Sequence, residues 1–554
     1  MILIILIFLV VTLILTFLFY ISIYNESYWR KRGVPFYTKN KVFGPIGDFL
    51  TSKRAFFEIM SDIYKQYPDA PAVGLGNFLI PALYVKDPEN VQHIFQAGFQ
   101  EFNHRDLDFI DDDLLADNLL FMHGNRWKVM RQSMSPLFTL AKLKNMYYII
   151  DKSAQDFVEF LRNNPEKLKG DTLDTLAHYC CAAMSAAVFG FQNKSTFESP
   201  NMYYILDKSA QDFIEFLKRN PEKLKGNAMQ TISHFCCAAI GAAVFGVSNK
   251  STFESPFLDM SQRAFTGNWK INVKFTIANI CSKFITFFRI RFFAEFQDFF
   301  IDAIKQVLRK REKENVIKHD FADICISLQK KGKLVDSETG FELTPTDELM
   351  AAQAFFFFTA GVEPTAASIF SVLFELGKNE EILTKVQEEI DHTFEKHNGE
   401  LNYDAVNEME FLNKVYNEAL RMYPPVGSLS RKCVQDTVLP VGNIRVEKGT
   451  KILVPVYEYH NDPKYFPNPE VFDPERFSSD EKPNDLHFMP FGKGNRLCIG
   501  MRYAVMQAKA ALVYLLRNYT VKSVIKEGGL KFRKESVFVR LENVDLEFIP
   551  REIK

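Results

Sequence analysis

Cysteine, excess charge and flexible linkers are all scarce in this 554-residue sequence. It has eight cysteines, four of them in the adjacent pairs Cys180-Cys181 and Cys236-Cys237, which argues against a disulfide scaffold and favours a reducing compartment. The 67 basic residues nearly equal the 68 acidic ones, so no overall field attracts nucleic acid. Because no Gly/Ser-rich or Pro-rich segment divides the chain after its first forty residues, we expect one large domain.

The amino-terminal residues 1–24 contain no charged side chain. A helix of about 20 apolar residues crosses a bilayer, whereas a signal peptide has a basic start and a small-residue cleavage site, which are missing here. The sequence therefore predicts a transmembrane signal-anchor over 1–24, the alternative being a buried hydrophobic helix. Arg30, Lys31 and Arg32 follow, which places the main body in the cytosol. A linker with proline and glycine is predicted over 25–45.

One cysteine lies in a glycine-containing loop near the end of the chain, in the stretch 491–500, which reads F-G-K-G-N-R-L-C-I-G. Gly494 and Gly500 are expected to let the backbone approach a flat ligand, and backbone amides pointing at the sulfur favour a thiolate over a thiol. A thiolate at Cys498 would be a metal ligand. The alternative is a buried free cysteine that packs as a small hydrophobe.

The spacing F-x-x-G-x-R-x-C-x-G resembles the haem-binding motif of the cytochrome P450 family, whose iron is held by a cysteine thiolate. This resemblance implies a mainly α fold with small β-sheets (α+β), as a single large catalytic domain over 46–554 behind the anchor. It implies haem b, iron protoporphyrin IX, as cofactor, with Cys498 as the axial iron ligand. Phe491, Gly494 and Arg496 would then be cofactor-binding residues.

Trp127 and Arg131 lie four residues apart on a predicted helix and share a face, so both could reach one anion. Taken alone, such a pair could equally be an ordinary surface pair. In the family that the sequence resembles, W-x-x-x-R holds a haem propionate. Arg431, which follows a Pro-Pro turn, resembles another propionate partner.

The longest apolar helical run of the main body is predicted over 349–378 and contains Ala360-Gly361-Val362-Glu363-Pro364-Thr365. A proline within a helix leaves the carbonyl four residues earlier without its donor. The segment resembles the oxygen-binding A-G-x-[DE]-T-[ST] of the family, which implies catalytic roles for Ala360, Gly361, Glu363 and Thr365. It departs from that pattern because proline replaces the first threonine. The hydroxyl comes one residue later, about 100° around the helix, so Thr365 is not expected to face the iron.

Glu418 and Arg421 form a helical E-x-x-R, which alone is most often a surface ion pair. Arg476 follows in a P-E-R-F segment. In the family these residues form a Glu–Arg–Arg network on the proximal side of the haem pocket.

Residues 145–200 and 201–256 are tandem copies that match at 41 of 56 positions. A closely packed domain has one slot for this helix pair. We therefore expect one copy inside the core and the other outside it, and the sequence leaves open which copy is which.

The five motifs together imply a monooxygenase that inserts one oxygen atom from O₂ into an apolar small molecule, and the anchor and phenylalanine-rich middle look most like the insect microsomal, xenobiotic-metabolising branch. Electrons would come from NADPH through NADPH-cytochrome P450 reductase, with cytochrome b5 as a candidate second partner, at the cytosolic face of the endoplasmic reticulum membrane. Lys128, Lys493 and Arg502 are candidate contacts for the reductase. Two alternatives remain: a haem-thiolate isomerase or dehydratase acting on peroxides, and a haem binder that the duplicated segment makes inactive.

Overall fold

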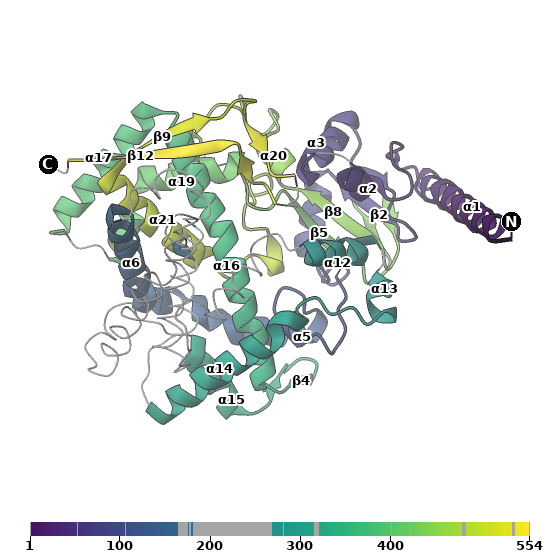
Figure 1. Ribbon diagram of the computed structural model, residues 1–554, viewed down its shortest axis with the longest axis horizontal. Coiled ribbons are helices and arrows are strands. Elements are labelled where there is room, and N and C mark those ends of the chain that lie inside the picture. Colours follow the sequence, from purple (N-terminus) through teal and green to yellow (C-terminus); the bar gives the residue numbers. More distant parts are fainter. Residues whose placement is uncertain are drawn as a thin grey trace.

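The computed structural model describes residues 2–51, 54–105, 107–163, 176, 179–180, 269–280, 282–314, 321–399, 402–478, 483–534 and 538–552. Helices dominate this part of the chain, as predicted (Figure 1). The α-helices are α1 (Ile2–Arg30), α2 (Gly44–Thr51), α3 (Phe56–Gln66), α4 (Pro88–Gln92), α5 (Gly124–Met134), α6 (Leu140–Asn163), α12 (Trp269–Ile280), α13 (Ser282–Phe287), α14 (Ala294–Glu314), α15 (Phe321–Lys331), α16 (Asp347–Leu376), α17 (Glu380–Lys396), α18 (Tyr403–Glu408), α19 (Glu410–Met422), α20 (Tyr457–His460) and α21 (Met501–Asn518). Short 3-10 or π turns are η1 (His93–Ala97), η2 (Leu114–Ala116), η3 (Ser135–Phe138), η5 (Pro474–Phe477) and η6 (Gly494–Arg496).

A four-stranded sheet lies beside the helices, in the order β1 (Ala72–Leu75), β2 (Ala82–Val85), β8 (Lys451–Pro455), β5 (Ser428–Lys432). Its central pair, β2 and β8, is parallel, and the outer pairs are antiparallel. The sheet therefore brings the first hundred residues against residues 428–455. An isolated bridge extends this contact by pairing His104 with Lys432. The two-stranded ladders are β3 (Leu334–Val335) with β4 (Glu342–Leu343), β6 (Thr437–Leu439) with β7 (Ile444–Val446), β9 (Tyr519–Ile525) with β12 (Val544–Pro550), and β10 (Lys531–Phe532) with β11 (Leu541–Glu542).

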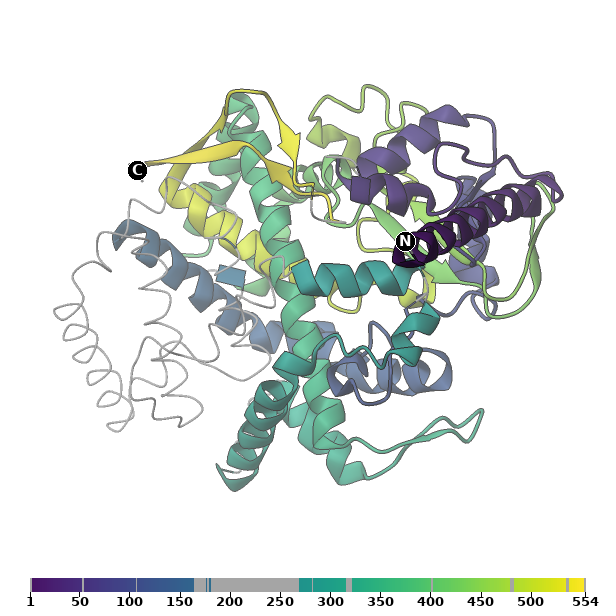
Figure 2. The ribbon, with the colours of Figure 1, turned by 45° about the vertical axis from the view of Figure 1, so that its right-hand side comes forward.

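The central element is α16, which contacts α14, α19 and α21 (Figures 1 and 2). Thr346 caps its start by accepting a hydrogen bond from the Leu349 amide, and the helix is continuous through Pro364. It buries apolar residues along most of its length. Its bounds agree within two residues with the predicted helix 349–378. A helix that is apolar all round needs neighbours on every side, and the buried stretches of α16 before and after Ala360 have them.

The apolar helix α1 extends away from the body, and nearly all of its residues up to Tyr20 are exposed, whereas Ile21 is buried (Figure 1). It is long and apolar enough to cross a membrane by length and composition. It continues past Tyr24 to Arg30, and its last turns are docked on the body: Trp29 is buried against Gly74, where a Cβ would lie 2.3 Å from the indole. The segment predicted as a linker thus begins as helix, held further by Asn25, whose amide donates to the Lys41 and Phe78 carbonyls.

The start of the first repeat copy lies in α6, which packs against α21. The Tyr514 hydroxyl donates a hydrogen bond to Asp151 at 2.7 Å. The Gln155 amide donates to the oxygen of that hydroxyl at 2.9 Å. Tyr179, also in the first copy, is buried and donates to the Gln507 carbonyl. The second copy, 201–256, lies outside the described residues. In the described part, the place beside α21 is therefore taken by the first copy.

Candidate active site

The cysteine loop folds back on itself just before α21. The Cys498 amide donates to the Phe491 carbonyl at 3.0 Å, and the Leu497 amide donates to Gly494 at 2.9 Å. Gly494 has a φ of +69°, and a Cβ there would lie 1.9 Å from the Phe95 carbonyl oxygen. Only glycine fits this position. Gly500 has a φ of −91°, so its role is different from the predicted backbone freedom.

The Cys498 side chain is exposed, yet protein surrounds it closely enough that burial raises the pKa of the thiol. Its sulfur is thus accessible to a group that fits between the surrounding elements. Three features oppose the effect of burial: a hydrogen bond from the Gly500 amide and the charges of Arg105 and Arg131 lower the pKa. The amide at the start of α21 points at the sulfur, as predicted, and favours the thiolate.

Four arginines gather around this loop: Arg105, Arg131, Arg431 and Arg496. Their hydrogen bonds in the described residues go to backbone carbonyls: Arg131 donates to Leu497, Arg105 to Arg496, Arg431 to Ser430, and Arg496 to Asn103 and Met122. Arg431 and Arg496 are 2% and 3% exposed. The Nε atoms of Arg105, Arg431 and Arg496, and Nη1 of Arg496, have no hydrogen-bond partner in the described structure.

These guanidinium groups repel one another. Burial, and then the charges of Arg105 and Arg131, lower the pKa of Arg496 to about 8. Burial lowers the pKa of Arg105 to about 10. Burial also lowers the pKa of Arg431 well below its usual value, and the charges of Arg105 and Arg496 lower that pKa further. Buried like charges with unused donors are costly unless an anion joins them. The cluster therefore fits a ligand with more than one negative charge.

Arg131, Arg431 and Arg496 were predicted from the sequence, but Arg105 was not. It lies in an irregular acidic stretch with no helical or strand periodicity to give it a direction. The signal that was present is a single arginine beside a histidine, His104, in that acidic stretch. Its place in the cluster comes from the bridge between His104 and Lys432, which sets Arg105 beside β5.

Trp127 and Arg131 both lie on α5 but make different contacts. The Trp127 ring, 8% exposed, lies 4.3 Å from the Arg496 guanidinium. The Arg131 guanidinium reaches the Leu497 carbonyl at 2.9 Å. Stacking on an aromatic face holds a guanidinium plane in place while leaving its edge free for an anion. Trp127 thus orients Arg496.

The predicted oxygen groove lies at the middle of α16. Ala360 is exposed and Gly361 half-buried, whereas Thr365 is only 3% exposed. The Thr365 carbonyl accepts from the Ser368 hydroxyl, which in turn accepts from Tyr416 at 3.2 Å. Thr365 and Ala360 therefore lie on different sides of the helix. The side chain of Glu363 lies outside the described residues.

The predicted Glu–Arg–Arg network is assembled on α19 and η5. Arg421 donates through Nε and Nη2 to the two oxygens of Glu418, both at 2.8 Å, and neither side chain is exposed. Arg476 Nε lies 3.4 Å from Glu418 Oε1, which also accepts from the Asp473 amide. Burial raises the pKa of Glu418, and its hydrogen bonds and ion pair with Arg421 oppose the shift.

The three candidate reductase contacts differ in their surroundings. Lys128 makes ion pairs with Asp336 at 3.1 Å and Glu338 at 2.6 Å. Its charge is therefore engaged within the chain, which the sequence did not indicate. Lys493 is half-buried and Arg502 is exposed.

Comparison with known proteins gives one family. The cytochrome P450 family model matches residues 35–199 and 191–545. The chain is 27% identical to Cytochrome P450 6B7 of Helicoverpa armigera over 98% of this chain and 97% of that protein. It is 30% and 31% identical to Cytochrome P450 6k1 and Cytochrome P450 6j1 of Blattella germanica, over 90% and 89% of this chain and 87% of each relative. The predicted resemblance to insect members, and with it the fold class, is confirmed.

Proposed function

The chain belongs to the cytochrome P450 family of haem-thiolate monooxygenases, and we propose that it oxidises apolar small molecules, xenobiotic or lipid-like, with NADPH-derived electrons. In this proposal haem b binds at the cysteine loop with Cys498 as the axial iron ligand. The insect relatives and the 54 phenylalanines of the chain support an apolar substrate.

The observation that carries the proposal is the arginine cluster beside an accessible cysteine. Haem has one metal centre that takes a thiolate and two carboxylates at its edge. The residues present fit both the iron and the carboxylates. At the iron, the Gly500 amide and the guanidinium groups of Arg105 and Arg131 lie near the Cys498 sulfur and favour its thiolate form. Arg105, Arg431 and Arg496 have buried donors without partners, which match the carboxylates. Gly494 lets the loop approach, and Phe491 and Trp127 complete the enclosure.

Bound haem would supply the oxygen activation, favoured by electron density from the thiolate. The chain itself binds, orients and excludes water. The Gly500 amide stabilises the negative charge on the Cys498 sulfur. The small side chains Ala360 and Gly361 leave room on their face of α16 for dioxygen and substrate.

Proton delivery is the step at which this chain departs from its family. Thr365 is buried away from the Ala360 side, next to Ser368 and Tyr416. We therefore assign the proton transfer to the Glu363 carboxyl and water beside it, with Thr365 in a packing role. This departure also keeps the isomerase or dehydratase as a second candidate, because such an enzyme acts on peroxides without needing protons for oxygen cleavage.

The proposed location is the endoplasmic reticulum membrane, with the body at the cytosolic face. The apolar helix α1 and the basic residues at its end, Arg30, Lys31 and Arg32, support this orientation. The reductase, and cytochrome b5 as a further donor, would dock near the cysteine loop at Lys493 and Arg502. Lys128 is a weaker candidate because it is paired with Asp336.

The experiment that tests the function uses the full chain in membranes with NADPH and the reductase. A thiolate-type Soret band of the reduced carbon monoxide complex, together with NADPH consumption coupled to oxidation of an apolar substrate, is expected. The same band with peroxide rearrangement but no coupled NADPH consumption would favour the isomerase, and absence of haem would overturn both. Lys493→Glu with Arg502→Glu should lower turnover at low salt more than at high salt, whereas Lys128→Glu should have the smaller effect.

A further inference from the structure

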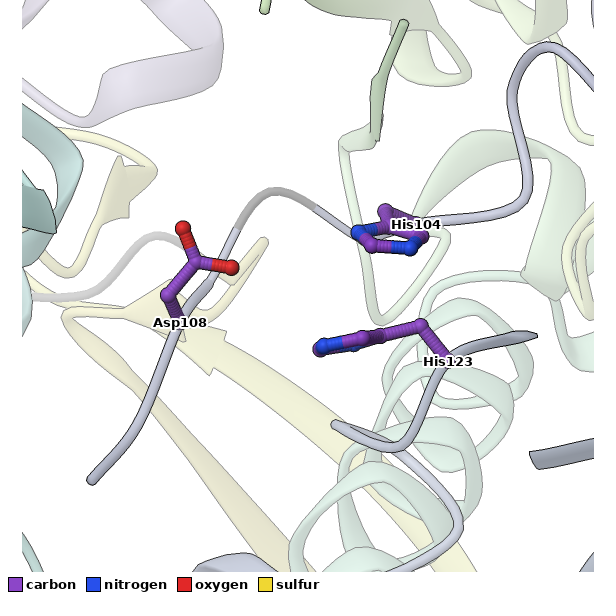
Figure 3. Close-up of side chains that lie close together, drawn as sticks. All are labelled: His104, Asp108 and His123. Atoms are coloured by element: carbon purple, nitrogen blue, oxygen red, sulfur yellow. The ribbon is translucent and has the colours of Figure 1, made fainter. Parts of the chain in front are cut away.

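A second group of ligating side chains lies next to the arginine cluster, apart from the cysteine loop. His104, Asp108 and His123 each offer one nitrogen or oxygen, and these atoms lie within 4.8 Å of one another (Figure 3). The two imidazole rings are stacked with centroids 4.0 Å apart, and the Asp108 carboxylate faces them from one side. The cluster joins the loop before η2 to His123, the residue that precedes α5.

The surroundings fix the backbone of His104 and give the side chains of Asp108 and His123 outer hydrogen-bond partners. The His104 backbone is tied to β5, because its carbonyl accepts from the Lys432 amide at 3.0 Å. A hydrogen bond between the His123 ring and the Phe121 backbone occupies one ring nitrogen and leaves the other for an ion. Lys432 Nζ donates to Asp108 Oδ2 at 2.6 Å, which leaves Oδ1. Metal-binding histidines and carboxylates characteristically have such outer partners.

We propose that His104, Asp108 and His123 bind a divalent transition metal ion of the Zn²⁺ type. Two imidazoles and a carboxylate suit zinc, copper or nickel, whereas magnesium and calcium prefer oxygen ligands alone. Tetrahedral zinc with bonds of about 2.0–2.1 Å holds its ligand atoms about 3.4 Å apart. Starting from distances within 4.8 Å, the ligand atoms need to approach one another by at most about 1.4 Å. With three protein ligands, one position stays open to water.

The position of the cluster determines how the ion is to be tested. His104 precedes Arg105, and His123 follows Met122, whose carbonyl accepts from Arg496. The nearby positive charges of Arg496 and Lys432 oppose a cation. Anionic carboxylates among the arginines would offset that repulsion. Zinc binding is therefore measured on the haem-containing chain, with haem content determined separately, so that a failure of the proposed haem site is distinguishable from a failure of the metal site.

The test uses the full chain without any histidine tag, dialysed against Zn²⁺ alone and analysed for bound zinc and haem. One zinc ion per chain is expected. His104→Gln and His123→Gln should each weaken binding by at least about tenfold, since even loss of an outer partner weakens metal binding by about 10–100-fold. The matched control is His392→Gln, an exposed histidine on α17, which should bind zinc like the parent chain.

A spectroscopic measurement covers the case in which a variant fails to fold. X-ray absorption at the zinc edge of the parent chain should show nitrogen and oxygen neighbours at about 2.0–2.1 Å, with imidazole scattering. Sulfur neighbours at about 2.3 Å would assign the ion to cysteines and overturn the proposal. So would the absence of stoichiometric zinc, or unchanged binding in both histidine variants.

Discussion

Arg431 has the least support of the four arginines around the cysteine loop. Its one hydrogen bond goes to the carbonyl of its own neighbour, Ser430, and its Nε has no partner in the described structure. The Phe95 ring, 4.6 Å from the guanidinium, holds its plane but supplies no negative charge. Such a residue costs folding free energy unless a ligand uses it. The donors of Arg431 are therefore better evidence for an anion-binding site than those of a surface arginine.

We expect Arg431→Met to release haem faster. A hydrogen bond to a charged group contributes about 1.5–3 kcal/mol, which corresponds to roughly 10- to 150-fold in haem retention. The measurement is the rate of haem transfer to apomyoglobin. Arg445→Met is the control, because Arg445 is 65% exposed and should leave the rate unchanged. Equal rates for parent and Arg431→Met would contradict the assignment of Arg431 to the haem carboxylates.

The two candidate proton donors on α16 are expected to respond differently. Thr365→Ala should leave the coupling of NADPH consumption to product formation essentially unchanged, since Thr365 is 3% exposed and lies on a different side of α16 from the exposed Ala360. Glu363→Gln should lower turnover by about 100-fold, the lower end of general acid contributions. A large loss of coupling in Thr365→Ala, with Glu363→Gln normal, would return the proton transfer to the hydroxyl.

At the scale of elements, the Glu418 network joins α19 to the segment around η5. Removing the charge by Glu418→Gln leaves Arg421 buried without its carboxylate, and breaking a buried ion pair costs about 3–5 kcal/mol. The free energy of unfolding should fall by that amount in denaturant titration. Lys414→Gln is a matched control, because Lys414 joins α19 to η5 through the partly exposed pair with Glu475 and should cost under about 1 kcal/mol. Similar losses in both variants would show that burial of the pair is not what matters.

Helix α20 contributes a buried acid, Glu458, which accepts from the Ser61 hydroxyl on α3 at 3.1 Å. Burial raises its pKa from 4.5 to about 7. The folded chain thus holds one proton more than the unfolded chain between these values, so stability is lost as pH rises through this window.

Glu458→Gln should remove this loss. At about 1.4 kcal/mol per pKa unit, the variant should exceed the parent in unfolding free energy by about 3 kcal/mol near pH 8 and match it near pH 4.5. Denaturant titrations at the two pH values check this. Glu470→Gln, an exposed acid, should show no such difference, and a variant less stable than its parent at high pH would contradict the raised pKa of Glu458.

Across the whole molecule, features local in sequence were predictable and contacts between distant segments were not. The cysteine loop, α16 and the Glu418–Arg421 pair each depend on spacing within one element. Arg105 joins the arginines because its neighbour His104 pairs with Lys432, more than three hundred residues away in the sequence. The pairing of Lys128 with Asp336, and the approach of His104 and Asp108 to His123, likewise arise from packing that no single segment encodes.

The tandem repeat raises the remaining question at this scale. The first copy occupies the place beside α21, where Asp151 and Gln155 meet Tyr514. Both residues recur in the second copy, as Asp207 and Gln211, so the second copy has the same residue types at these two positions. We propose that either copy is sufficient for this place. The two pieces of the family match, which overlap at 191–199 near the junction of the copies, support the proposal.

The prediction is that deletion of 145–200 and deletion of 201–256 each leave a haem-binding chain, but with different stabilities. Tyr179, whose hydroxyl donates to the Gln507 carbonyl at 2.8 Å, corresponds to Phe235 in the second copy. The chain that keeps only the second copy loses this hydrogen bond and should be less stable by about 1 kcal/mol. Introducing Phe235→Tyr into that chain should supply the missing hydroxyl and remove the difference in stability. Haem content and denaturant titration of the three chains measure both effects, and loss of haem in both deletions would show that the copies are jointly required.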